Sequence, residues 1–233
     1  MTYTLELDES VREGIARCAR DQLDRAVRDL SERITEEPIK AVHSARKAVK
    51  KERSLLRLAR GTMSSKQRRR ENRALRAAAR RLSTARDAEV MVQTLEELAR
   101  RYVGQVPGNT FDGVREQLER VRDAQREELV SSALDAQAVG ELGAVRVRVE
   151  DWNLTTGGWK AIEAGLLRSY GDGRAAFLSA RSRRSTTRLH TWRKRTKDLW
   201  YQERLLITAG GPTVAGHVKD VHLLADLLGD DHD

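Results

Sequence analysis

Residues 42–50 read VHSARKAVK, and residues 189–197 read LHTWRKRTK. Both stretches fit one pattern, an apolar residue followed by His-x-x-Arg-Lys-x-x-Lys, at an offset of 147 positions. On an α-helix, a rotation of about 100° per residue places the His, Arg and Lys of each stretch on one face. In the first copy, small and apolar residues such as Ala45 and Val49 fall on the opposite face. The pattern predicts two amphipathic helices, each with one basic face.

The rest of the chain shows the same helical periodicity. Of its 233 residues, 39% are hydrophobic, 34% are charged and 4% are aromatic, and only 3 are Pro. This composition is typical of helices and excludes an all-β fold or a disordered chain. The segment 144–150 alternates as AVRVRVE, for which we favour a helix or turn over a strand. We therefore expect an all-α helical bundle. Its helices are predicted at about 9–33, 38–60, 64–101, 110–134, 136–142, 158–171, 174–209 with a break near 185, and 214–228.

A second pair of landmarks follows the two motif stretches. Leu82 is followed five residues later by Asp87, and Leu228 is followed five residues later by Asp233, at an offset of 146 positions. Two landmarks in the same order and at nearly the same spacing indicate duplicated halves. We predict one domain over residues 1–233, with repeat halves at about 5–142 and 153–233.

The charge of the chain points to a polyanionic partner. Lys and Arg number 44 against 35 Asp and Glu, which gives a formal net charge of +9 and a pI near 10.0. Like charges four residues apart destabilise an isolated helix by a few tenths of a kcal/mol each, so a stripe of them indicates a compensating anion. Nucleic acid, an anionic membrane surface and polyphosphate are partners of this kind. A solvated basic face without a ligand is the alternative.

Three groups of basic residues are candidates for anion binding. The first helical face carries His43, Arg46, Lys47, Lys50, Arg53 and Arg57. The second face carries Arg183, His190, Arg193, Lys194, Lys197 and Arg204. Between them, Arg76, Arg80 and Arg86 are expected to line the same site, whereas Arg68–Arg70 are expected to face solvent. Asp87 and Asp233 either orient nearby cations or form local helix ion pairs.

The repeated motif, with the Leu-x-x-x-Arg-Asp element of residues 82–87 between its copies, resembles the CHAD family (conserved histidine α-helical domain). The resemblance covers about residues 5–233. It implies two pseudo-symmetric helical halves that enclose a basic channel, and it implies binding of inorganic polyphosphate by a stand-alone domain. By motif match, the first anion-binding strip would comprise His43, Arg46, Lys47, Lys50 and Arg53. The second strip would comprise His190, Arg193, Lys194 and Lys197.

The chain departs from the family pattern in its second half. Trp200 stands where the family often has Arg, and His232 stands where the first half has Arg86. Both changes make the second strip less basic at its edges. The sequence also ends at Asp233, where the family usually continues for another helix, so we expect the second half to be cut or short.

Catalytic and metal-binding patterns are weak in this sequence. It contains no Gly-rich phosphate loop, no His-Glu-x-x-His and no nucleophile elbow, so we predict neither an enzyme nor a cofactor. A phosphorelay role for His43 is disfavoured because its helical neighbours are cations. His222 and Asp226 are spaced as two metal ligands, but no three- or four-ligand spacing accompanies them, so no metal site is predicted.

These observations predict a binder of inorganic polyphosphate. The alternatives are a helical nucleic-acid-binding protein and a basic interaction scaffold, and the scarce aromatic residues disfavour stacking on single strands. No apolar run of 18 residues exists, so we expect no membrane partner, and the sequence does not predict an oligomeric state. The single Cys18 and the polar start MTYTLELDES favour the cytoplasm. An association with polyphosphate granules would follow from polyphosphate binding.

Overall fold

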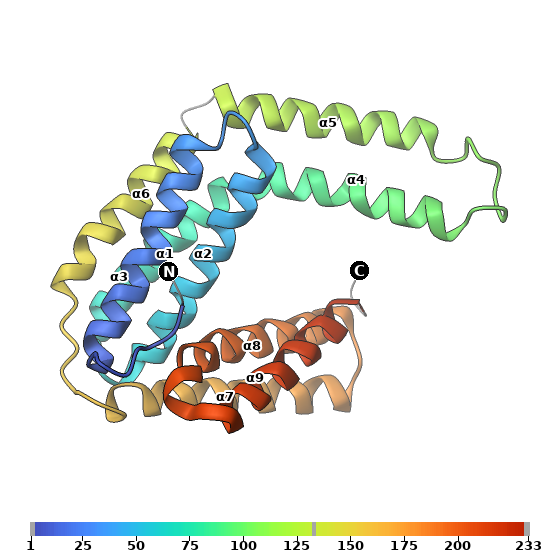
Figure 1. Ribbon diagram of the computed structural model, residues 1–233. Helices are drawn as coiled ribbons and strands as arrows, with labels where there is room; N and C mark the ends of the chain where they lie inside the picture. Colours follow the sequence, from blue (N-terminus) through green and yellow to red (C-terminus); the bar gives the residue numbers. More distant parts are fainter. Residues whose placement is uncertain (1–2, 132–133, 231–233) are drawn as a thin grey trace.

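A computed structural model describes residues 3–131 and 134–230 (Figure 1). In these ranges the chain is helical and forms no β-sheet, so the predicted all-α class is confirmed. None of the described helices is long and apolar enough to cross a membrane. The α-helices are α1 (Val11–Glu32), α2 (Pro38–Leu58), α3 (Ser65–Arg81), α4 (Ser83–Arg101), α5 (Asp112–Ser131), α6 (Leu134–Arg148), α7 (Lys160–Ser182), α8 (Thr186–Leu205) and α9 (Ile207–Asp230). Two short 3-10 helices, η1 (Ala59–Gly61) and η2 (Val149–Asp151), follow α2 and α6.

Helices α1, α2, α3 and α6 pack side by side into one bundle (Figure 1). Ser10 caps α1, because its hydroxyl accepts from the Glu13 N–H at 3.2 Å while the Glu13 carboxylate accepts from the Ser10 N–H at 2.9 Å. Pro38 begins α2, where a missing N–H breaks no helical hydrogen bond. The Ser64 hydroxyl caps α3 by accepting from the Gln67 N–H at 3.2 Å. Local sequence signals therefore set where these helices begin.

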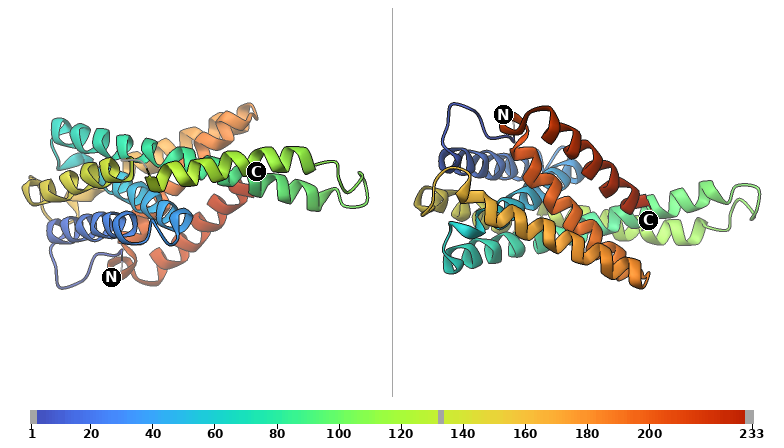
Figure 2. Two further views of the ribbon diagram at one scale, coloured as in Figure 1. Left: turned by 90° about the horizontal axis from the view of Figure 1, so that it is seen from above. Right: turned by 90° about the horizontal axis from the view of Figure 1, so that it is seen from below.

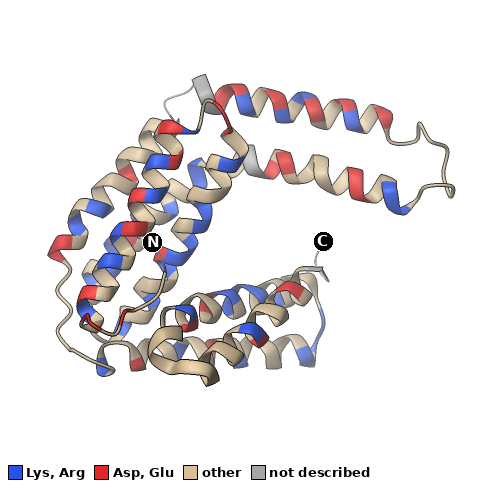
Figure 3. Ribbon diagram, viewed as in Figure 1, with Lys and Arg blue, Asp and Glu red and all other residues tan. Residues whose placement is uncertain are grey.

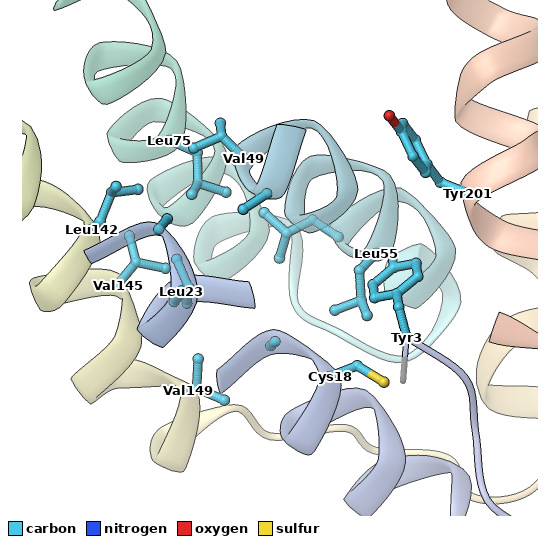
Figure 4. Packing of buried hydrophobic residues seen from close by; sticks show 14 of the residues in the cluster. Tyr3, Cys18, Leu23, Val49, Leu55, Leu75, Leu142, Val145, Val149 and Tyr201 are labelled. Carbon is cyan, nitrogen blue, oxygen red and sulfur yellow. The ribbon is translucent and has the colours of Figure 1, made fainter. Parts of the chain in front are cut away.

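The core of the bundle is made by the apolar faces of all four helices (Figure 4). Leu23 of α1, Leu55 of α2, Leu75 of α3 and Leu142 of α6 belong to one apolar cluster, and each of these four residues is at most 1% exposed. On this side α2 presents Ala41, Ala45 and Ala48 beside larger apolar residues, and these alanines let the neighbouring helices approach closely. Because the apolar face of α2 packs into the core, its basic face lies on the side of the helix that points away from the core.

The stretch predicted as one helix at 64–101 is two helices, α3 and α4, which meet at Leu82. Leu82 leaves helical geometry with φ −87° and ψ 6°, and its side chain is fully buried. The Ser83 hydroxyl donates to the carbonyl of Arg80 at 2.7 Å, so a side chain replaces part of the helical backbone pattern. Tertiary burial and a local hydroxyl bond therefore bend the chain where periodicity alone predicts continuity. Conversely, the segments predicted at 136–142 and 144–150 are continuous, because α6 runs through both as far as Arg148 and η2 follows directly.

Helices α4 and α5 form a hairpin that projects from the bundle, as all views show (Figures 1 and 2). We call residues 83–131 the arm. Its two helices contact mainly each other, with Val92 and Leu95 buried, while Met91 stays 54% exposed. The arm contains 10 acidic and 7 basic residues, so its formal charge is −3 and the remainder of the chain carries +12. Figure 3 shows both signs interspersed along α5.

Helices α7, α8 and α9 form a second group (Figure 1). Helix α7 continues through Gly171 and Gly173, where the sequence predicts a break. The predicted break near residue 185 is confirmed, and the Ser185 hydroxyl caps α8. Helix α9 is kinked at Gly211, whose φ of 61° favours glycine, just before Pro212.

Helix α2 joins the two groups, because it packs against α7 and α8 as well as against the bundle. The Ser54 hydroxyl donates to the Asp198 carbonyl at 2.7 Å, and the Gln202 side-chain amide donates to the Ser54 carbonyl at 3.2 Å. On α7, Gly165 lies so close to α2 that a β-carbon there would overlap the carbonyl oxygen of Leu58. These contacts hold α8 beside the basic face of α2.

Candidate functional site

Basic side chains of α2 and α8 line a common cavity of about 480 Å³. Three come from the first predicted face and four from the second, namely Lys50, Arg53 and Arg57 on α2 and His190, Arg193, Lys194 and Lys197 on α8. Arg195, Asp198 and Tyr201 also line it. We call this space the α2/α8 cavity. Two stretches that lie 147 positions apart in the sequence therefore line one cavity.

A second cavity of about 330 Å³ lies where α1 joins α2 and α8. We call it the His43 cavity. Its basic lining residues are Arg25 of α1, His43, Lys47 and Lys51 of α2, and Arg204 of α8. In its described lining there is no acidic residue. His43 and His190, which occupy equivalent motif positions, thus line two different cavities that share helices α2 and α8.

Asp198 is the one acidic residue in the described lining of the α2/α8 cavity. Its carboxylate accepts from Arg57 Nη1 at 3.0 Å and from Arg195 Nη1 at 3.3 Å. Burial raises the pKa of Asp198, and the neighbouring guanidinium groups oppose that rise. Burial also lowers the pKa of Arg53 and of Arg57. One carboxylate therefore faces several cations, which leaves the cavity positive.

Hydrogen bonds hold several of the guanidinium groups in place. Arg53 Nε donates to Asn72 Oδ1 of α3 at 3.0 Å, and Arg57 Nη1 donates to the Arg53 carbonyl at 3.1 Å. Arg46 Nη1 donates to the Ala79 carbonyl of α3 at 3.1 Å and does not line either cavity. Side chains fixed in this way lose less rotamer freedom when they bind an anion.

The sequence matches the family model of the CHAD domain over residues 17–233, nearly the whole chain. The chain belongs to the CHAD domain family. The match spans α2 and α8 and confirms the family predicted from the repeated motif. No curated protein matches the sequence.

This CHAD domain holds a buried lysine that the motif does not include. Lys51 is 7% exposed, and its Nζ lies 4.9 Å from the centroid of the Tyr3 ring. The Tyr3 hydroxyl donates to the Lys51 carbonyl at 3.1 Å. Burial lowers the pKa of Lys51 to about 8, and Arg204, Lys47 and Arg25 add to the effect. Lys51 follows Lys47 by four residues, so helical spacing is the signal that could have placed it beside the predicted face.

The remaining predicted residues are not brought into either cavity. Arg76 and Arg80 are exposed on α3, and Arg183 is exposed just after α7. The side chain of Arg86 lies outside the described residues, and so do residues 232–233. The basic lining of this CHAD domain is therefore concentrated on α2 and α8, with a contribution from α1.

A third basic cavity, of about 550 Å³, lies at the start of α3. Arg69 and Arg70 are exposed, as the sequence predicts, whereas Arg68 is half-buried. Arg70 pairs with the buried carboxylate of Glu71 at 2.8 Å. The residues that line this cavity are Ser64, Lys66, Gln67, Arg69, Arg70 and Arg73. All of them come from α3 and its cap, so only one helix supplies cations there.

Proposed function

We propose that this CHAD domain binds inorganic polyphosphate along the surface shared by α2 and α8. The observation that carries the proposal is that two basic helix faces line one cavity, in which Asp198 is the one acidic residue of the described lining. Lys and Arg donate charge-assisted hydrogen bonds to phosphate oxygens, and Arg matches two oxygens at once. A linear chain of equivalent phosphates suits a surface that offers many cations and no base-reading groups.

The His43 cavity extends the same basic surface. Lys47 lines it and Lys50 lines the α2/α8 cavity, and the two residues are one turn apart on α2. A polyphosphate chain held by Lys50 therefore continues past Lys47 towards Lys51 and Arg204. This arrangement supports contact with several consecutive phosphates, and affinity then rises with chain length.

The surface suits binding better than phosphoryl transfer. Its cations hold an anion, and the one acidic group of the described α2/α8 lining, Asp198, is already bonded to Arg57 and Arg195. The imidazoles of His190 and His43 line the two cavities among basic side chains, an arrangement that holds an anion. We infer a binding module whose energetics are multivalent electrostatics.

Nucleic acid is the second candidate, and the cavity at the start of α3 is the observation that favours it. Its exposed Arg69 and Arg73 resemble a phosphate-contacting helix face. Single strands, however, are usually held by stacking of bases on aromatic side chains. Tyr201 is the one aromatic residue in the described lining of the three basic cavities.

Competition binding tests the proposal. A labelled long polyphosphate would be displaced by unlabelled polyphosphate, RNA, duplex DNA, ATP and orthophosphate at one ionic strength. We expect long polyphosphate to compete at the lowest concentration and orthophosphate at the highest. With six to ten phosphate contacts, the logarithm of affinity should fall with the logarithm of salt concentration at a slope of about −4 to −7. Equal potency of RNA would favour the nucleic-acid role, and equal potency of orthophosphate would contradict multivalent binding.

A further inference from the structure

A cavity of about 550 Å³ lies away from the basic residues, where the N-terminal segment meets α7, α8 and the start of α9. Its wall is largely apolar. Among its lining residues are Leu5, Trp159, Ile162, Leu166, Leu206 and Val214. Within the described part of the chain, no Lys or Arg lines it. In a chain with 44 basic residues, this lining is suited to a ligand other than a polyanion.

The kink in α9 opens this cavity. Gly210 follows the C-terminal end of α8 closely, and a β-carbon there would overlap the side chain of Val214. Gly211 then takes a φ of 61°, which redirects the helix before Pro212. Leu206 and Val214 consequently line opposite ends of the redirected segment and both face the same space. The glycine pair is therefore needed for the shape of the cavity.

Two polar groups meet at the apolar wall. Glu203 is 8% exposed, and His217 Nδ1 lies 3.0 Å from its Oε1. The second oxygen, Oε2, is buried without a hydrogen-bond partner in the described part of the chain. Burial raises the pKa of Glu203, and His217 opposes that rise. With the carboxylate ionised and the imidazole neutral, Nδ1–H donates to Glu203 and Nε2 is left as an acceptor.

We propose that this cavity binds a small, neutral, largely apolar molecule whose single hydroxyl group donates a hydrogen bond to Nε2 of His217. Its volume falls in the range of small-molecule sites, and apolar walls with a few convergent polar groups are typical of such sites. The imidazole, whose side chain is 54% exposed, lines the cavity, and the buried carboxylate behind it fixes its tautomer. The same carboxylate disfavours anionic ligands.

Three probes of one shape test the ligand class at pH 8. They are naphthalene-2-methanol, its methyl ether, which lacks the donor, and 2-naphthoate, which is an anion. Titration is followed by the chemical shift of the Trp159 indole N–H, because Trp159 lines the cavity. We expect the alcohol to bind about tenfold more tightly than the ether and than the naphthoate. Equal affinity for alcohol and ether, or no shift with any probe up to its solubility, would overturn the proposal.

Variants locate the interaction. His217→Phe should abolish the difference between alcohol and ether, whereas His222→Phe, the same change five residues further along the same helix, should preserve it. Val214→Trp should fill the cavity and abolish binding of all three probes. A retained alcohol preference in His217→Phe, or retained binding in Val214→Trp, would contradict the site. Polyphosphate affinity and the circular dichroism spectrum serve as folding controls for each variant, and loss of polyphosphate binding in wild type would leave this inference intact.

Discussion

The α2/α8 surface and the arm are both rich in charged residues, but they arrange them in opposite ways. In the arm, cations sit beside carboxylates, as in the contacts of Arg126 with Glu89 at 2.7 Å and of Arg122 with Asp123 at 2.9 Å. On the α2/α8 surface, many cations share Asp198 as the one acidic residue of the described lining. The net charge of +9 is therefore unevenly distributed. In the arm, carboxylates offset the cations, whereas the α2/α8 surface is positive.

The difference follows from what each region packs against. The arm helices contact mainly each other, and Arg115, Arg122 and Arg126 each pair with a carboxylate along or across the hairpin. Helix α2 is covered by the bundle on its apolar side, and its basic side meets a second basic face on α8. Repulsion between those faces is offset by the hydrogen bonds of Ser54 and Gln202 and by the close contact at Gly165. Because packing keeps these two basic faces close together despite their repulsion, an anion that binds between them relieves that repulsion.

Charge reversal should separate the two regions most clearly. Arg193→Glu combined with Lys197→Glu changes two residues of the α2/α8 cavity, and we expect polyphosphate affinity to fall at least about 100-fold. Arg100→Glu combined with Arg101→Glu makes the same charge change at the exposed end of α4, and we expect less than a threefold loss, apart from a shared long-range contribution. Isothermal titration at one salt concentration provides the comparison. Equal losses in both variants would show that binding is diffuse.

Removal of the carboxylate from the α2/α8 cavity should raise polyphosphate affinity, whereas charge reversal of the cations lowers it. Asp198→Asn leaves an uncharged acceptor beside Arg57 and Arg195 and makes the cavity more positive, so polyphosphate affinity should rise about tenfold. The unfolding free energy should fall by about 2 kcal/mol, because two guanidinium groups lose their counter-ion. Glu96→Gln on the arm is the matched control, with neither effect expected. Weaker binding by Asp198→Asn would mean that the carboxylate orients the cations that bind.

Alkaline pH should weaken binding through the His43 cavity. Lys51 has a pKa of about 8 in the free protein because burial and neighbouring cations disfavour its ammonium form. A bound polyanion favours that form, so binding takes up a proton, and affinity should fall about fivefold as the pH rises from about 7 to about 9.5. Lys51→Met should flatten this dependence, while Lys219→Met, an exposed lysine on α9, should not. An unchanged pH profile in Lys51→Met would place the ligand away from this cavity.

The smallest effect is expected from a single ion pair of the arm. Arg126→Gln removes the contact with Glu89, and the free energy of unfolding in urea should fall by at most about 1 kcal/mol, since the pair is partly exposed. Polyphosphate affinity should stay within twofold of wild type. A larger loss of affinity would show that the arm contacts the ligand, and the contrast between the two regions would then be wrong.

The sequence predicts the helices and the two basic faces because both depend on periodicity within one helix. It does not predict that the chain bends at Leu82. That bend depends on burial of the Leu82 side chain in a core whose other residues lie far away in the sequence. Asp198 and Lys51 were missed for a related reason. Their roles depend on which helix lies opposite, and each is set by contacts between residues far apart in the sequence, such as Arg57 with Asp198 or Lys51 with Tyr3. The motif likewise includes Arg46, but it does not indicate that the Arg46 guanidinium donates a hydrogen bond to the Ala79 carbonyl.

The close approach of Gly165 to Leu58 helps to set the distance between α2 and α8. Helix α7 packs against both α2 and α8, so the space that position 165 leaves to α2 also sets how far α8 stands from it. Any side chain at this position would widen that gap and move the cations of α8 away from those of α2. A residue that lines none of the basic cavities thus acts as the spacer between the two rows of charge, and the width of the ligand that fits between them depends on an absent methyl group.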